Sequence, residues 1–222
     1  MNGDDPDEML AAVYAADGPE ANRSLYARWA ATYETGFVTD RRYGYPEQVV
    51  SVFAEHGLAG VGEGDAVVDV GCGTGLAGVA LRRRAAVAVD GLDISPEMLQ
   101  HAASKQHDGV PVYRELIEVD LTQPLRIESG TYAGVVSVGT FTHGHVGPAS
   151  LDEVLRIVRP GGVAAIGINA AHFAAAGFGE AFDHLGSSGR IADLRLVDVP
   201  IYDGADMTDP DQFAHVALFT VG

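Results

Sequence analysis

The sequence predicts an α/β fold in which seven strands form a mostly parallel sheet with an antiparallel C-terminal strand, and helices cover both faces. Valine-rich apolar runs alternate with helix-like segments, a pattern typical of parallel sheets. A glycine-rich turn at residues 71–75 directly follows one of these runs, as at a strand-to-helix connection. Only residues 202–212 separate the last two runs, which is too short for a helical crossover, so these two strands should pair antiparallel.

Two helices are expected before the first strand. Residues 22–33 carry Tyr26, Trp29, Ala30 and Tyr33 at the i, i+3, i+4 and i+7 spacing of one helical face. Residues 46–56 begin with a proline and end before a glycine, the usual signals of a helix start and stop. The strands that follow are expected at residues 67–70, 87–92, 112–119, 132–138, 163–168, 194–201 and 213–221.

Local signals also mark the helices between the strands. Ser95 and Pro96 predict the N-cap and the first residue of a helix over residues 96–105. Residues 150–153 match a capping box, and the helix they open has to stop near Arg159 because Pro160 cannot continue it. Further helices are expected at residues 76–84 and 171–185.

The composition is that of an ordinary globular protein, with 222 residues, 47% apolar and 20% charged. We expect an acidic N-terminal extension at residues 1–21 and a single domain at residues 22–222, with residues 22–60 as a helical cap over the ligand site. The first ten residues lack the apolar region of a secretory signal, and no apolar run is long enough to span a membrane. Cys72 is the only cysteine, which fits a reducing cytoplasm. A monomer or a homodimer is expected.

The formal net charge of −17 disfavours nucleic acid as a partner, because such a field repels phosphate backbones. An apolar or cationic small molecule is the easier partner, and no membrane partner is expected.

The turn at residues 71–75 is the most informative segment. Gly71, Gly73 and Gly75 let the backbone bend sharply and let a ligand approach main-chain N–H groups, beside a helix N-terminus that favours an anion. The dinucleotide fingerprint needs its third glycine one residue later, where this chain has Leu76. The spacing therefore disfavours a nicotinamide-dependent oxidoreductase, as does the terminal strand pair.

A second acid supports a nucleoside ligand. Asp93 stands near the position where the second strand of a βαβ unit ends, so its carboxylate is placed to accept from both ribose hydroxyls. The alternative for Asp93 is a simple turn carboxylate.

These residues resemble those of the class I S-adenosylmethionine-dependent methyltransferases, which have a Rossmann-like sheet. The resemblance rests on residues 67–75, 91–99, 119–121 and 158–162. Within the family, residues 27–34 and 138–146 are most similar to the Williams–Beuren-region methyltransferase-like group.

The resemblance implies S-adenosyl-L-methionine as the cofactor, S-adenosyl-L-homocysteine as its product, and a role for each matching residue. Asp69 and the glycine turn would face the methionine moiety, and Asp93 would bind the ribose. The residues expected to pack on or bond the adenine, or to line the site beside it, are Ile94, Met98, Asp120, Leu121 and Val138. Tyr26 and Tyr33 either close over the cofactor or pack against the sheet.

Methyl transfer to an oxygen or nitrogen is an in-line displacement that requires approach geometry, and for a hydroxyl acceptor a general base. His143 and His145 follow the fourth strand at the sheet's C-terminal edge and are candidates for that base. The alternatives are a hydrogen-bonded loop histidine or a cofactor contact, and no metal site is expected. Phe173, Phe178, Phe182 and Tyr202 could line an apolar acceptor pocket, but helical spacing favours the core as the alternative.

We therefore expect an enzyme that methylates a small molecule. A protein methyltransferase, or a cofactor-binding regulatory module without turnover, remains the alternative.

Overall fold

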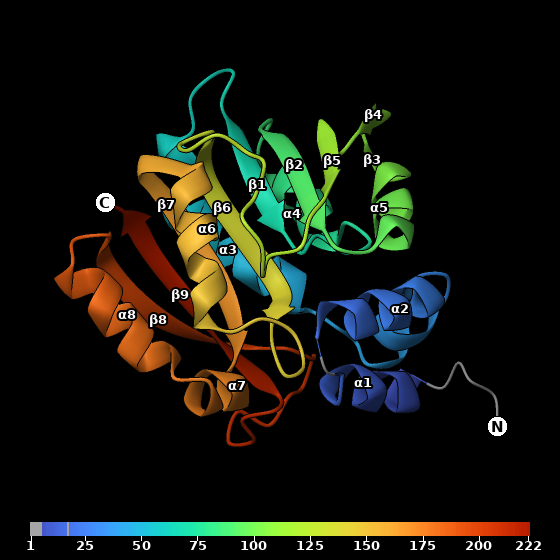
Figure 1. Cartoon of the computed structure of the whole chain (residues 1–222). Helices are drawn as coiled ribbons and strands as arrows, with labels where there is room; N and C mark the ends of the chain where they lie inside the picture. Colours follow the sequence, from blue (N-terminus) through green and yellow to red (C-terminus); the bar gives the residue numbers. More distant parts are fainter. Residues whose placement is uncertain (1–5, 17) are drawn as a thin grey trace.

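A computed structural model describes residues 6–16 and 18–222 (Figure 1). Its main sheet has seven strands in the order β5-β2-β1-β6-β7-β9-β8. Their bounds are β1 Ala66–Val70, β2 Ala88–Asp93, β5 Glu115–Glu118, β6 Tyr132–Phe141, β7 Val158–Asn169, β8 Ile191–Pro200 and β9 Phe213–Val221. Strand β9 runs antiparallel to both neighbours, and the other pairings are parallel. The predicted fold class is confirmed.

Helices lie on both faces of the sheet and at one end of it (Figure 1). Their bounds are α1 Pro6–Tyr14, α2 Pro19–Trp29, α3 Tyr45–His56, α4 Leu76–Arg84, α5 Pro96–Ala103, α6 Leu151–Ile157, α7 Ala170–Ala175 and α8 Phe178–Ser187. Shorter pieces are the π-helix η1 Glu34–Val38, the 3₁₀ turns η2 Leu58–Gly60 and η3 Pro148–Ser150, and a small hairpin of β3 Gln106–His107 and β4 Val110–Pro111. None of the helices in the described part combines the length and apolar character that a membrane span requires.

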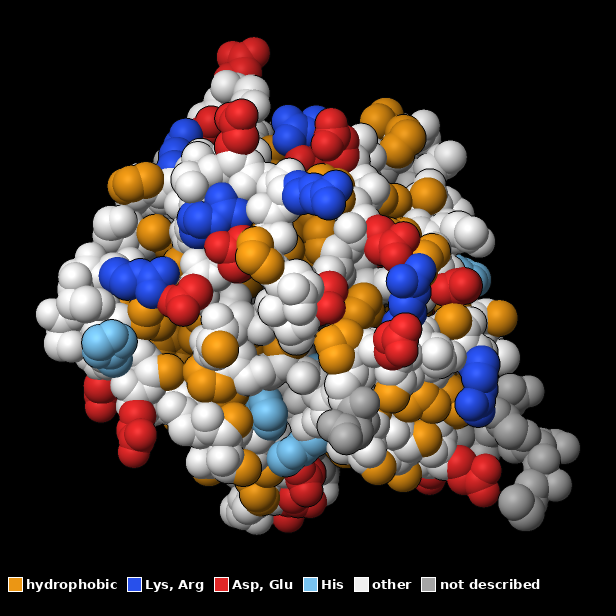
Figure 2. Space-filling view, in the orientation of Figure 1, with side chains coloured by type: hydrophobic (Ala, Val, Ile, Leu, Met, Phe, Trp, Pro, Cys, Tyr) orange, Lys and Arg blue, Asp and Glu red, His pale blue; other side chains and the backbone are white. Residues whose placement is uncertain are grey.

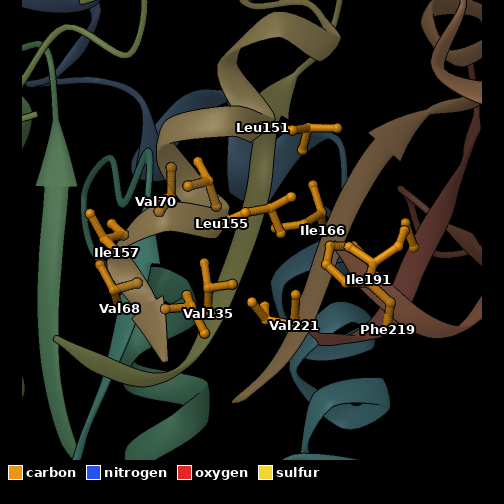
Figure 3. Close-up of a cluster of buried hydrophobic side chains, with 14 of the residues drawn as sticks. Val68, Val70, Val135, Leu151, Leu155, Ile157, Ile166, Ile191, Phe219 and Val221 are labelled. Atoms are coloured by element: carbon orange, nitrogen blue, oxygen red, sulfur yellow. The ribbon is translucent and has the colours of Figure 1, made fainter. Parts of the chain in front are cut away.

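The sheet separates two apolar cores, because alternate residues of each strand point to opposite faces. Val68 of β1 and Val135 of β6 face α6, where they meet Leu155 and Ile157 (Figure 3). Val67 on the other face packs in the cluster formed with α3 and α4. Strands buried on both faces explain the continuous valine runs of the sequence.

A third apolar cluster lies apart from the sheet, at the C-terminal ends of its central strands. Met9 and Val13 of α1 are buried against Trp29 of α2 and Phe37 of η1. The segment expected to be an acidic extension therefore includes a packed helix, and we call α1, α2 and η1 together the cap.

Four expected elements differ from the structure, besides β6 and β7, which extend beyond the strands predicted at residues 132–138 and 163–168. The helix predicted over residues 22–33 ends at Trp29 and is followed by turns and η1. The helix predicted over residues 171–185 is split by Gly177, which has a φ of +76°. The strand predicted over residues 112–119 is limited to Glu115–Glu118.

The fourth difference is the capping box predicted at residues 150–153, which does not form. Ser150 has helical backbone angles and caps nothing through its side chain, because the 3₁₀ turn from Pro148 leads directly into α6. Glu153 instead pairs with Arg156 at 2.8 Å and accepts from the Leu125 N–H.

Candidate functional site

One cavity lies under the cap, at the carboxyl ends of β1, β2 and β6. It holds about 1410 Å³ of space, including the open space at its mouth. The cap is fastened over it by side chains from three places. Lys105 pairs with Glu34 at 2.7 Å, Arg23 pairs with Glu118 at 2.8 Å, and Asn22 donates to the Gly144 carbonyl.

The floor of the cavity is the glycine turn. Gly71, Gly73 and Gly75 have φ angles of +69°, +52° and +95°, a region that favours glycine. A Cβ at Gly71 would overlap the Thr140 side chain, whereas a Cβ at Gly73 would point into open space. No side chain therefore separates the backbone of Gly73 from the cavity.

Gly75 has a different place from the other two glycines. It is the N-cap of α4, and a Cβ there would lie 2.9 Å from the Tyr113 ring. It does not line the cavity, so the structure does not bring this predicted cofactor residue to the ligand side.

Asp93 ends β2 and lines the cavity beside the turn. Its Oδ2 accepts from the Gly73 N–H at 2.8 Å, and its Oδ1 accepts from the Ser95 N–H at 2.9 Å. Burial raises the pKa of Asp93, and these two hydrogen bonds oppose the rise. Ser95 in turn accepts from the Met98 N–H and caps α5 as predicted.

Asp69 lies deeper, one position before the end of β1, and is fully buried. Its Oδ2 accepts from the Tyr113 hydroxyl at 2.7 Å, and that hydroxyl accepts from the Gly78 N–H at 3.2 Å. Its Oδ1 has no hydrogen-bond partner among the described residues. Burial raises the pKa of Asp69 to about 7, although the bond from Tyr113 opposes it.

Five predicted residues beside the turn line the same cavity: Ile94, Met98, Asp120, Leu121 and Val138. Met98 is buried, and the Asp120 Oδ1 accepts from the Thr122 N–H at 2.8 Å. The structure thus brings these residues to the same cavity as Asp93, although they come from three separate segments, residues 94–98, 120–121 and 138.

Tyr26 and Tyr33 line the cavity and also pack within the cap. Tyr26 stacks on Trp29 with ring centroids 6.0 Å apart, and Tyr33 meets Trp29 edge-on at 5.0 Å. Both tyrosines therefore line the cavity and pack within the cap and not against the sheet, while their closure over a cofactor stays a prediction.

The two candidate base histidines have different surroundings. The ring nitrogens of His145 lie 2.8 Å from the His143 carbonyl (Nδ1) and 2.9 Å from the Tyr26 hydroxyl (Nε2). The carbonyl can only accept, so Nδ1 carries the hydrogen and Tyr26 donates to Nε2. Burial lowers the pKa of His145 to about 4. His143 does not line the cavity, and its Nε2 lies 3.6 Å from Asp211.

The sequence did not single out several residues of this site, among them Tyr113, Tyr45 and Asn169. Tyr113, which binds Asp69, stands 44 positions from it, and no local pattern marks such a contact. Tyr45 and Asn169 line the cavity with buried polar atoms that lack partners among the described residues. Their positions at the start of a helix and the end of a strand were the available signals. Phe178 and Phe182 belong to the core, as their spacing favoured.

Comparison with known proteins agrees with this geometry. Residues 67–162 match a family described as a methyltransferase domain. Human methyltransferase-like protein 27 is 34% identical over 160 residues, which is 70% of this chain, and the chain covers 62% of that protein's length.

Solved structures share the fold. A complex of the Haloferax volcanii Trm112 methyltransferase activator with a methyltransferase contains a chain with a TM-score of 0.62 and 24% identity, covering 88% of this chain and 96% of that one. The [4+2]-cyclase SpnF has a TM-score of 0.65 and 15% identity, covering 93% and 97%. A geranyl diphosphate methyltransferase solved with GPP and sinefungin has a TM-score of 0.55 and 17% identity, covering 78% and 76%.

The family match identifies a methyltransferase domain at residues 67–162, as the motifs predicted. Over 70% of its length the chain is similar to methyltransferase-like protein 27, and its sheet has the fold of the solved methyltransferase structures.

Replacing Tyr113 with phenylalanine should destabilise the protein. The Tyr113 hydroxyl bonds both Asp69 and the Gly78 N–H, so Tyr113→Phe leaves two buried groups unpaired and should lower the free energy of unfolding by roughly 1–3 kcal/mol. Urea denaturation measures this loss. Tyr45→Phe is the matched control, because that buried hydroxyl has no partner among the described residues. Equal stability of the two variants would contradict the account.

Asp69 and His145 should give opposite pH dependences of stability. Folding raises the pKa of Asp69 from 3.8 to about 7, so between pH 4.5 and 6 this acid is protonated in the folded state and ionised in the unfolded state. Folding lowers the pKa of His145 from 6.5 to about 4, so in the same range this histidine is neutral in the folded state and protonated in the unfolded state. The two contributions cancel in the unmodified chain. Relative to it, Asp69→Asn should lose about 1.4 kcal/mol of stability per pH unit on acidification, and His145→Gln should gain as much.

Chemical denaturation at several pH values in this range tests both slopes. The double variant is the control and should return to the slope of the unmodified chain. Parallel pH profiles for the two single variants would show that both pKa shifts are absent, and a single variant that parallels the unmodified chain would show that the shift of its own residue is absent.

Proposed function

We propose that this protein binds S-adenosyl-L-methionine and transfers its methyl group to an oxygen or nitrogen of a small-molecule acceptor. The observation that carries the proposal is the pair Asp69 and Asp93, a fully buried and a half-buried acid at the ends of adjacent strands, which both line the cavity beside the exposed backbone of Gly73. Asp69 presents an oxygen without a partner among the described residues, which suits a cation.

The residues present fit the groups of this cofactor. The remaining lone pairs of Asp93 suit the ribose hydroxyls, and the free Oδ1 of Asp69 suits the amino acid's ammonium. Thr74 has a buried hydroxyl without a partner in the described chain, and it precedes α4, whose N-terminus suits the carboxylate. Ile94 and Met98 supply an apolar surface for the adenine.

When bound, the cofactor supplies a methyl group already activated by its sulfonium, and the protein has to orient and shield it. The cap shields the methyl group, because Tyr26 and Tyr33 line the cavity beneath it. Thr140 fixes the turn from below by donating to the Val70 carbonyl at 3.0 Å. We propose that the acceptor approaches the methyl group from the remaining side of the cavity, next to β6 and β7.

His145 serves in this proposal to position Tyr26. A base is most effective when its pKa is near the working pH, and burial places the pKa of His145 well below that range. Both of its nitrogens are also engaged. We propose no proton transfer to His143, because this residue does not line the cavity.

The fastened cap favours a small acceptor over a protein. A peptide would have to displace contacts such as Lys105–Glu34 and Asn22–Gly144 to enter. The small-molecule methyltransferase solved with GPP is a precedent for the fold, and the cyclase SpnF shows that the same fold carries another chemistry. The proposal includes a cytoplasmic location, supported by the single, buried Cys72.

Incubation with methyl-labelled cofactor and cell extract tests turnover. Label in the small-molecule fraction together with S-adenosyl-L-homocysteine would support the proposal. Label in protein would support the protein acceptor, and binding without any labelled product would support a regulatory module.

Replacing Asp93 with alanine should weaken cofactor binding by roughly 1–3 kcal/mol, because the ribose hydroxyls lose their acceptor. Calorimetric titration with S-adenosyl-L-methionine measures the change. Asp90→Ala is the control, because Asp90 lies on the same strand but bonds Arg114 and does not line the cavity. Unchanged affinity in Asp93→Ala would refute the ribose assignment.

A further inference from the structure

The cavity has a second half that the cofactor proposal does not use. It lies over the ends of β6 and β7 and beneath the cap. Its side chains carry no formal charge, and the principal ones are Tyr14, Tyr43, Tyr45, Thr142, Asn169 and Tyr202. We call this region the acceptor half.

Asn169 presents a buried hydrogen-bond donor to the acceptor half. Its Oδ1 accepts from the His172 N–H at 3.0 Å and caps α7, which fixes the orientation of the amide. The opposite end, Nδ2, is buried and has no partner among the described residues. The side chain is 3% exposed, so water does not readily replace that partner.

Tyr45 presents a second donor on the same side of β7. A Cβ at Gly167 would overlap the Tyr45 hydroxyl, so this hydroxyl lies over the strand two positions before Asn169, on the same face. The hydroxyl is buried and unpaired within the described part of the chain. Burial raises the pKa of Tyr45, which keeps the hydroxyl protonated as a donor.

The charges around the cavity exclude an anionic ligand here. No lysine or arginine lines the cavity in the part of the chain that the structure describes. Arg41 stacks outside Tyr202 at 6.0 Å and pairs with Asp7. A carboxylate or phosphate would therefore be buried without a counter-ion, which is costly.

A cation is disfavoured for a different reason. The three acids of the cavity, Asp69, Asp93 and Asp120, all belong to the half beneath the proposed cofactor. The tyrosine rings alone would attract a cation. However, the unpaired Nδ2 of Asn169 can only donate, and it would point its positive hydrogens at a cation.

We infer that the acceptor half recognises an uncharged small molecule, whose carbonyl or similar oxygen accepts hydrogen bonds from Asn169 and Tyr45 while its apolar or aromatic body packs among the tyrosine rings. This inference rests on the proposed function, because it takes the other half for the cofactor. An oxygen that accepts these bonds would relieve two buried, unpaired donors at once.

Three phenols with a neutral, an anionic and a cationic para substituent test the inference: 4-hydroxybenzamide, 4-hydroxybenzoate and tyramine. The full chain is first titrated with S-adenosyl-L-homocysteine by calorimetry, and the saturated protein is then titrated with each phenol. We expect the neutral amide to bind at least tenfold more tightly than either charged probe.

Two variants test whether Asn169 and Tyr45 donate hydrogen bonds to the bound ligand. Asn169→Asp keeps the oxygen that caps α7 but removes the N–H donor, and Tyr45→Phe removes only the unpaired hydroxyl. Each should weaken binding of the amide at least tenfold and leave the affinity for S-adenosyl-L-homocysteine unchanged. Tyr45→Phe should also be no less stable than the unmodified chain, which excludes misfolding as the cause. Tyr132→Phe, outside the cavity, is the control for ligand binding.

The inference is overturned if 4-hydroxybenzamide does not bind, if a charged probe binds as tightly, or if both variants bind the amide unchanged. Failure of the proposed function is distinguishable, because the first titration would then show no binding of S-adenosyl-L-homocysteine.

Discussion

The buried carboxyl group of Asp69 is the constraint on which the rest of this site depends. An acid with one unpartnered oxygen at the end of a buried strand destabilises the fold unless it is protonated or meets a cation. Tyr113 satisfies the other oxygen and reaches it across the helix that follows the glycine turn. The turn itself leaves the backbone at Gly73 bare, so that a ligand can approach both acids.

The cap completes the site by covering it with aromatic side chains. Its buried Trp29 and Phe37 give it a small core, which is joined to the domain by a few polar contacts and by the packing of Phe37 on Tyr43 and Tyr202. Acidic and basic side chains are interspersed over the face shown in Figure 2, so the high net negative charge does not form one patch there.

Local sequence signals predicted the elements well where the backbone alone decides the structure. The three glycines of the turn have positive φ angles, and Ser95 caps its helix. The capping box at Ser150 failed because a neighbouring turn and the Glu153–Arg156 pair took its place. The contact between Tyr113 and Asp69 and the unpaired atoms of Asn169 depend on tertiary packing, which spacing along the chain does not encode. The domain boundaries and the individual cofactor contacts stay predictions.

Proton release on cofactor binding tests the role of Asp69 most directly. At pH 6 the raised pKa of about 7 leaves this acid mostly protonated, and a bound ammonium group would make it ionise. Calorimetry with S-adenosyl-L-methionine in buffers of different ionisation enthalpy should therefore show release of close to one proton, which Asp69→Asn abolishes. Binding without proton release, or with the same release in Asp69→Asn, would contradict the account.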